Sequence, residues 1–157
     1  MTDLTKRPHT LIPPPLVLAI IAVLMWALDR ALVQGRIMTA FNTPVAVTLL
    51  AAGLALMALA AMQFITVKTT INPMRPARAT ALMVSGVFKL SRNPIYLADL
   101  LILAAFCVWL GNVINVLMLV FFVCYIARFQ IEPEERALRT LFGETYSAYC
   151  ANVRRWL

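Results

Sequence analysis

Apolar and polar residues follow one another along this chain in long blocks. Nearly uninterrupted apolar runs occupy residues 16–34, 44–67, 94–110 and 113–131. A helix needs about 20 apolar residues to cross the hydrocarbon core of a bilayer, and runs of this kind are typical of membrane-spanning helices. The pattern therefore predicts an all-α, polytopic membrane protein with about four transmembrane helices.

Turn and cap residues mark the boundaries of these runs. Pro44 follows Asn42 and Thr43, a combination that suits the first turn of a helix. Gly111 and Asn112 separate the last two runs and have the chemistry of a tight turn. We therefore expect an antiparallel helical hairpin there. Both of its helices are short for a full crossing, so flanking residues extend them or the bilayer thins locally.

Residues 133–156 change to the spacing of an amphipathic helix. Arginine and glutamate side chains lie opposite apolar residues that recur near the helical period, namely Leu138, Leu141, Phe142, Tyr146, Tyr149, Val153 and Trp156. We predict an interfacial helix that bends at Gly143, with Arg154, Arg155 and Trp156 at the level of the lipid headgroups. With a polar leader over residues 1–15, the whole chain, 1–157, is interpreted as a single domain.

Composition places this domain in lipid. Of 157 residues, 62% are hydrophobic and 13% charged, which is far more apolar surface than a soluble domain of this length can bury. The formal net charge of +7 lies in basic residues between the apolar runs. Such residues are topology signals rather than the basic stripe of a nucleic-acid-binding protein, so we expect no nucleic-acid partner.

Charge distribution also predicts the orientation of the chain. Lysine and arginine are frequent in the leader, in residues 68–92 and near the C-terminus, but absent from the turn at Gly111. The positive-inside rule therefore places both termini and residues 68–92 in the cytoplasm, with the chain in the cell (inner) membrane. Arg30 and Arg36, between the first two runs, fit this topology poorly.

The first run has a competing interpretation as a secretory signal peptide, because Lys6 and Arg7 precede it. No clear small-residue cleavage motif follows the run, which favours an uncleaved anchor.

Cysteine and histidine offer no metal-ligand pattern. Cys107, Cys124 and Cys150 are widely separated, and the single histidine, His9, lies in the leader. We therefore expect neither a disulfide framework nor a metal site.

Two charged clusters, at residues 91–96 and 132–135, lie at the same end of the predicted hairpin. Because its helices are antiparallel neighbours, these clusters must converge. Arg92, Tyr96 and Asp99 are spaced by four and then three residues, so they share one helix face. Asp99 would lie about one turn into the membrane, where an ionisable group must face a cavity or a partner.

Structural roles remain open for the same residues. Asn93 and Pro94 suit a helix start, and Arg92 suits a membrane-surface anchor. Glu134 and Glu135 would complement the positive end of a helix that begins at Pro133. Asp99 is equally compatible with a structural ion pair.

The residues of both clusters resemble a known family. Ser85, Gly86, Val87 and Phe88, then Ser91 to Leu97, are followed after the hairpin by Glu134, Glu135, Leu138, Phe142, Gly143, Tyr146 and Tyr149. This order is similar to the isoprenylcysteine carboxyl methyltransferase and phospholipid methyltransferase superfamily, and in particular to its small bacterial members. The resemblance covers about the C-terminal two-thirds of the chain.

The resemblance implies a membrane methyltransferase whose cofactor is S-adenosylmethionine. The cofactor site that it implies comprises Gly86, Phe88, Arg92, Asn93, Pro94, Tyr96, Glu134, Glu135 and Tyr146. An arginine and a glutamate suit the carboxylate and ammonium of the donor's amino-acid tail. Arg92, Asp99 and Glu135 are the candidate catalytic residues, and Asp99 or Glu135 would take a proton from an ammonium acceptor.

The acceptor is implied only as a class. A prenylcysteine-like carboxylate, a phospholipid amine and a small hydrophobic compound all remain open, and so does the oligomeric state. The expected partners are the bilayer and this lipophilic substrate. Two rival functions also remain, an NADPH-dependent enzyme like the membrane sterol reductases and a non-enzymatic membrane scaffold.

Overall fold

The computed structural model describes residues 12–32, 35–67 and 82–157. These residues form α1 (Pro14–Ala31), α2 (Asn42–Val67), α3 (Pro94–Leu110), α4 (Val116–Ile126) and α5 (Glu132–Asn152). Short 3-10 helices, Gly86–Lys89 and Val113–Asn115, precede α3 and α4, and a π-helical turn, Ala127–Ile131, joins α4 to α5. No strand occurs within the described ranges.

Length and composition allow three helical stretches to cross a membrane, namely Pro14–Ala31, Asn42–Thr66 and Val113–Asn152. The apolar helix α3 is shorter, at 17 residues, and lies between them in the bundle. The prediction of an all-α, polytopic membrane protein is therefore confirmed.

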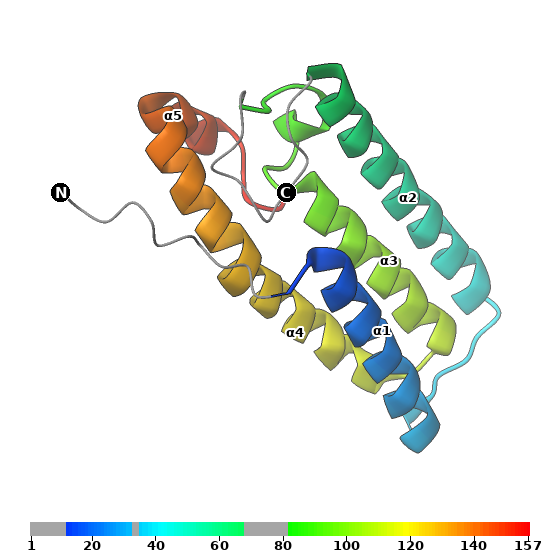
Figure 1. Ribbon diagram of the computed structural model, residues 1–157. Helices are drawn as coiled ribbons and strands as arrows, with labels where there is room; N and C mark the ends of the chain where they lie inside the picture. The colour runs from blue at the N-terminus through cyan, green and yellow to red at the C-terminus, as the bar shows by residue number, and fades with distance from the viewer. Residues whose placement is uncertain (1–11, 33–34, 68–81) are drawn as a thin grey trace.

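Helix α3 is the centre of the bundle, because it contacts α1, α2 and α4 (Figure 1). The main apolar core lies between α1, α3 and α4 and includes Ile21, Met25, Leu103, Phe122 and Ile126. Large apolar side chains also point outward, and on α2 Val47, Leu54, Leu59, Met62 and Ile65 are more than half exposed. A bundle that is apolar inside and outside is typical of a lipid environment.

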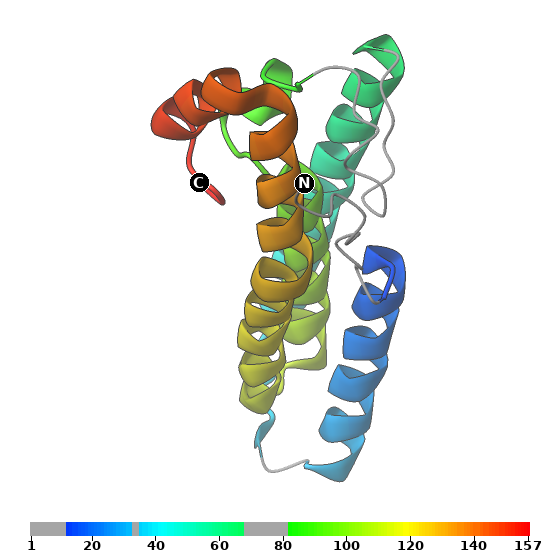
Figure 2. The ribbon, with the colours of Figure 1, turned by 60° about the vertical axis from the view of Figure 1, so that its left-hand side comes forward.

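Helix α5 bends at Gly143, as the sequence predicts, and its second half turns across the end of the bundle (Figure 2). Gly143 has φ 50° and ψ −121°, a conformation that side chains with a Cβ rarely adopt. The helix ends at Asn152 rather than at residue 156, and Val153 has extended backbone angles. We call the residues that follow α5, Val153–Leu157, the C-terminal strap.

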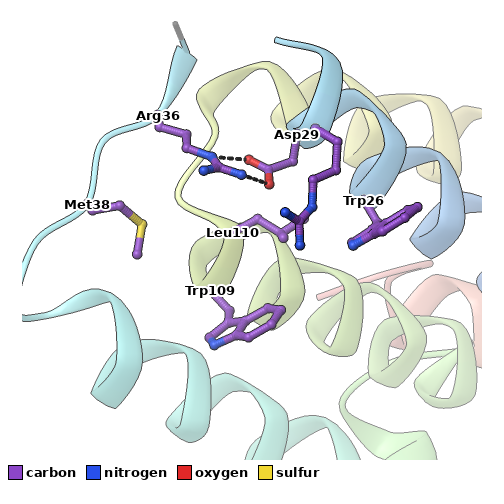
Figure 3. Close-up of a pocket in the computed structure, with 7 residues that line it drawn as sticks. Trp26, Asp29, Arg36, Met38, Trp109 and Leu110 are labelled. Atoms are coloured by element: carbon purple, nitrogen blue, oxygen red, sulfur yellow. Dashed lines mark hydrogen bonds and ion pairs between the residues drawn. The ribbon is translucent and has the colours of Figure 1, made fainter. Parts of the chain in front are cut away.

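The opposite end of the bundle is held by a partly buried ion pair. Asp29, 2% exposed at the end of α1, accepts hydrogen bonds from Nε and Nη2 of Arg36 (Figure 3). The amide of Asn112, in the turn after α3, donates to Asp29 and to the carbonyl of Leu32. Arg36, which fits the positive-inside rule poorly, therefore has its charge neutralised within the protein.

This ion pair predicts unequal effects of removing its two partners. Arg36→Gln leaves a 3% exposed carboxylate without a cation, whereas Asp29→Asn leaves a guanidinium that is 35% exposed and can reach water. We expect Arg36→Gln to lower the free energy of unfolding in detergent more than Asp29→Asn does, because only the first leaves a buried charge without a partner. The double variant should be more stable than Arg36→Gln alone. This account would be contradicted if the two single variants lost equal free energy of unfolding, or if their losses added strictly in the double variant.

Candidate functional site

The two charged clusters of the sequence meet at one end of the bundle. The hydroxyl of Tyr96, in the first turn of α3, donates to Oε1 of Glu134, at the start of α5, over 2.5 Å. Nη2 of Arg92 lies 3.4 Å from Oε1 of Glu135. The convergence that the hairpin predicts is therefore present in the structure.

A second arginine, Arg155 of the C-terminal strap, also binds Glu135. Its Nε lies 3.2 Å from Oε1 and its Nη2 2.7 Å from Oε2, a two-point contact with the whole carboxylate. Donating these hydrogen bonds raises the pKa of the Arg155 guanidinium. Glu135 is thus held between two cations while its side chain is only 10% exposed. We call Arg92, Tyr96, Glu134, Glu135 and Arg155 the end cluster.

Proline residues position both helix starts of the end cluster. Pro94 is buried and is the first residue of α3. A backbone N–H at this position would have no intrahelical partner, so the helix loses no hydrogen bond to the proline. Pro133 cannot donate to the carbonyl of Phe129, and the wider π-helical turn directly before it accommodates this gap in an otherwise continuous helix. Glu134 and Glu135 follow in the first turn of α5.

Backbone contacts hold the C-terminal strap against the start of α3. The N–H of Arg92 donates to the carbonyl of Arg154 over 3.0 Å, and Nδ2 of Asn93 donates to the carbonyl of Arg155 over 2.9 Å. Trp156 is partly buried against the apolar core. These long-range contacts hold the strap against the protein, and the position of Arg155 and Trp156 at the level of the lipid headgroups stays a prediction.

Gly86 and Phe88 fix the segment that leads into α3. Gly86 has φ 55°, and a Cβ there would lie 1.5 Å from the amide nitrogen of Gln63 on α2. The ring of Phe88 packs edge-on against Phe64 of α2, with 5.5 Å between ring centroids. Its carbonyl accepts a hydrogen bond from Tyr149. These contacts give both residues a structural role, and their contact with a cofactor stays a prediction.

Asp99 and Tyr146 are buried, at 4% and 2% exposed. The Tyr146 ring centroid lies 5.9 Å from the guanidinium carbon of Arg139. Asp99 lies one turn beyond Tyr96 on α3 and makes no hydrogen bond or ion pair with another described residue. The structure thus joins Tyr96 to Glu134 and Arg92 to Glu135 but shows no hydrogen bond or ion pair from Asp99 to these described residues.

Arg155 and Cys150 are members of the site that sequence reasoning missed. Cys150 Sγ accepts a hydrogen bond from Nη1 of Arg92. The sequence signal for Arg155 was the pair of arginines before Trp156. A hydrophobic pattern along one helix cannot show that the chain turns back toward the start of α3. Nε of Arg92 is buried without a hydrogen-bond partner among the described residues. A buried N–H donor without an acceptor is costly in free energy. It therefore indicates a hydrogen-bond acceptor from outside the described residues.

Removal of the Asn93 side chain should loosen the C-terminal strap. In Asn93→Ala, the carbonyl of Arg155 loses a hydrogen-bond donor, so the strap is held less firmly beside Arg92. We expect the backbone amide hydrogen of Arg92 to exchange about fivefold faster, which is the effect of one lost hydrogen bond. Hydrogen exchange of the detergent-purified chain measures this change. Asn152→Ala is the matched control, because Nδ2 of Asn152 donates only within α5, to Ala148. Unchanged exchange in Asn93→Ala would show that this contact does not hold the strap.

Comparison with known proteins relates about two-thirds of this chain to one family. A family model described as phospholipid methyltransferase matches residues 41–145, and confirms the resemblance noted from the sequence. An uncharacterized protein of Haemophilus influenzae is 47% identical over 62 residues, which is 40% of this chain and 98% of that protein. No solved structure matches. The family match includes Arg92, Tyr96, Glu134 and Glu135 but ends before Arg155.

Proposed function

Because this chain belongs to the phospholipid methyltransferase family, we propose that it transfers a methyl group from S-adenosylmethionine to a lipophilic acceptor. Membership of the family supports methyl transfer to a lipid-type substrate. The finer proposal rests on one observation, the buried carboxylate of Glu135 held between the guanidinium groups of Arg92 and Arg155. This arrangement lies at the end of an apolar bundle, where a polar donor and a lipid-soluble acceptor can meet.

The charges of the end cluster fit the amino-acid tail of the donor. Two guanidinium and two carboxylate groups have formal charges that sum to zero, which suits a zwitterion of one ammonium and one carboxylate. Arg92 would bind the carboxylate, and Glu135 would accept hydrogen bonds from the ammonium. Gly86, Phe88, Asn93, Pro94, Tyr96, Glu134 and Tyr146 would complete the pocket.

S-adenosylmethionine supplies an electrophilic methyl group on a sulfonium centre. The protein's contribution is to align the reactants and to exclude water, since alignment alone can remove much of a barrier. Tyr96, Glu135 and Tyr146 are buried, which favours a dry site. Asp99 would accept the proton of an ammonium acceptor, whereas a carboxylate acceptor needs no base.

Orientation and domain organisation are part of this proposal. We place the end cluster and both termini in the cytoplasm, with the chain in the cell (inner) membrane and residues 1–157 forming one domain. The lysine and arginine residues of the leader, of residues 68–92 and near the C-terminus support this orientation, whereas Arg30 and Arg36 fit it poorly.

A transfer assay tests the proposal. The purified chain is placed in vesicles of bacterial lipid extract with S-adenosylmethionine labelled in its methyl group, and label in the organic phase is measured. We expect Glu135→Gln to lower this transfer roughly 10- to 100-fold, because it loses charge-assisted hydrogen bonds. Glu144→Gln, exposed on the same helix, should transfer at the parent rate.

The rival functions give different results in the same preparation. An enzyme like the sterol reductases would oxidise NADPH with a sterol acceptor and would transfer no label. A scaffold would do neither, and its Arg92 and Glu135 variants would retain its function. Failure of the folded parent chain to transfer label to any of the three acceptor classes would contradict our proposal.

The Tyr96–Glu134 hydrogen bond gives a second prediction. Tyr96→Phe leaves Glu134 without its hydroxyl donor, so the carboxylate loses its position, and we expect kcat/KM to fall about tenfold. The same assay measures the change. Tyr125→Phe is the control, because the Tyr125 ring packs against Phe129 in the membrane-spanning part. Parent-like activity of Tyr96→Phe would remove this hydrogen bond from the site.

A further inference from the structure

A pocket lies at the end of α1, at the opposite end of the bundle from the end cluster, and Figure 3 shows the residues that line it. It has a volume of about 320 Å³. The end of α1, the connection to α2 and the end of α3 line it with Trp26, Asp29, Arg30, Arg36, Met38 and Trp109. All of these except Trp109 precede the residues that the family model matches, so the family does not assign this pocket.

The pocket carries an excess of positive charge. The carboxylate of Asp29 is engaged through both oxygens by Arg36. The guanidinium of Arg30 lies over the ring of Trp26, 5.6 Å from the centroid, and no carboxylate of the described residues forms an ion pair with it. Two guanidinium groups and one carboxylate leave a formal charge of +1. One singly charged anion would therefore balance the pocket.

The surroundings indicate where this anion comes from. Trp26 and Trp109 are 50% and 55% exposed, the half-buried state that is typical of indoles at the level of lipid headgroups. The connection beside the pocket exposes Ile37, Met38 and Phe41. Exposed apolar side chains next to a cationic pocket suit a molecule that combines a phosphate with acyl chains better than a free ion.

We propose that this pocket binds the phosphate group of an anionic phospholipid, from the membrane leaflet opposite the end cluster. Arg30 supplies the charge-assisted hydrogen bonds to the phosphate, and Arg36 remains with Asp29. The indole of Trp109 and the side chain of Met38 contact the glycerol and the adjoining part of the acyl chains. Arg30 thereby gains a counter-ion on the membrane face where the positive-inside rule disfavours it. This binding is independent of methyl transfer.

Fluorescence quenching by brominated lipids tests the proposal, because two of the three tryptophans line the pocket. Trp156→Phe removes the third, at the other end of the bundle, and serves as the parent. This full-length chain is placed in vesicles of phosphatidylcholine that contain dibrominated phosphatidylglycerol or dibrominated phosphatidylcholine at equal mole fractions. We expect the pocket to prefer phosphatidylglycerol over phosphatidylcholine about fivefold. This factor is the effect of one basic residue at an anionic headgroup.

Variants at Arg30 separate a binding site from general attraction to an anionic membrane. Arg30→Gln should lower the ratio of anionic to zwitterionic lipid binding to about one. Arg30→Lys should retain most of the preference for the anionic lipid. Arg139→Gln removes one exposed charge at the other end and should keep the parent preference. No preference in the parent, or a preference that survives Arg30→Gln, would overturn the proposal. Loss of the preference when inorganic phosphate replaces chloride at constant ionic strength would assign the pocket to a free anion and overturn the lipid assignment.

Discussion

A buried carboxylate between two guanidinium groups is the interaction on which the rest of this structure depends. Glu135 lies at the end of an apolar bundle, where a charge without partners would be very costly. Arg92 approaches it from the start of α3 and Arg155 from the C-terminal strap. The bend at Gly143 is needed because only a chain that turns back can bring Arg155 to Glu135. Three segments that are distant in sequence are therefore held together by one charge.

The ion pairs of the described residues lie at the two ends of the bundle. At the far end, Asp29, Arg36 and Asn112 join α1, the connection and the hairpin turn. Between the two ends, the helices pack through apolar side chains and also present apolar side chains outward. Lipid can then surround the bundle, while polar molecules have access only at its ends. In our proposals, this division places the methyl donor at one end and phospholipid binding at the other.

The sequence was sufficient for the parts of the structure that follow from local patterns. Apolar runs predict the helices, the Gly111 turn predicts the hairpin, and the hairpin predicts that Arg92 and Glu135 converge. Arg155 could not be predicted, because its contact depends on the bend at Gly143 and on a strap that leaves the helical period after Asn152. Pairing of Arg36 with Asp29 was also hidden, since a count of basic residues per loop takes no account of a neighbouring carboxylate.

Binding of S-adenosylmethionine to the detergent-purified chain, measured by calorimetry, tests most directly whether the end cluster is a cofactor site. The account predicts binding to the parent chain and affinities at least about tenfold weaker for Arg92→Ala and for Arg155→Ala. Arg136→Ala, at an exposed position of α5, should leave the affinity unchanged. The Arg155 variant is decisive, because this residue lies outside the family match and is assigned from the structure alone. A folded parent chain that does not bind, or an Arg155→Ala variant that binds as tightly as the parent, would contradict the account.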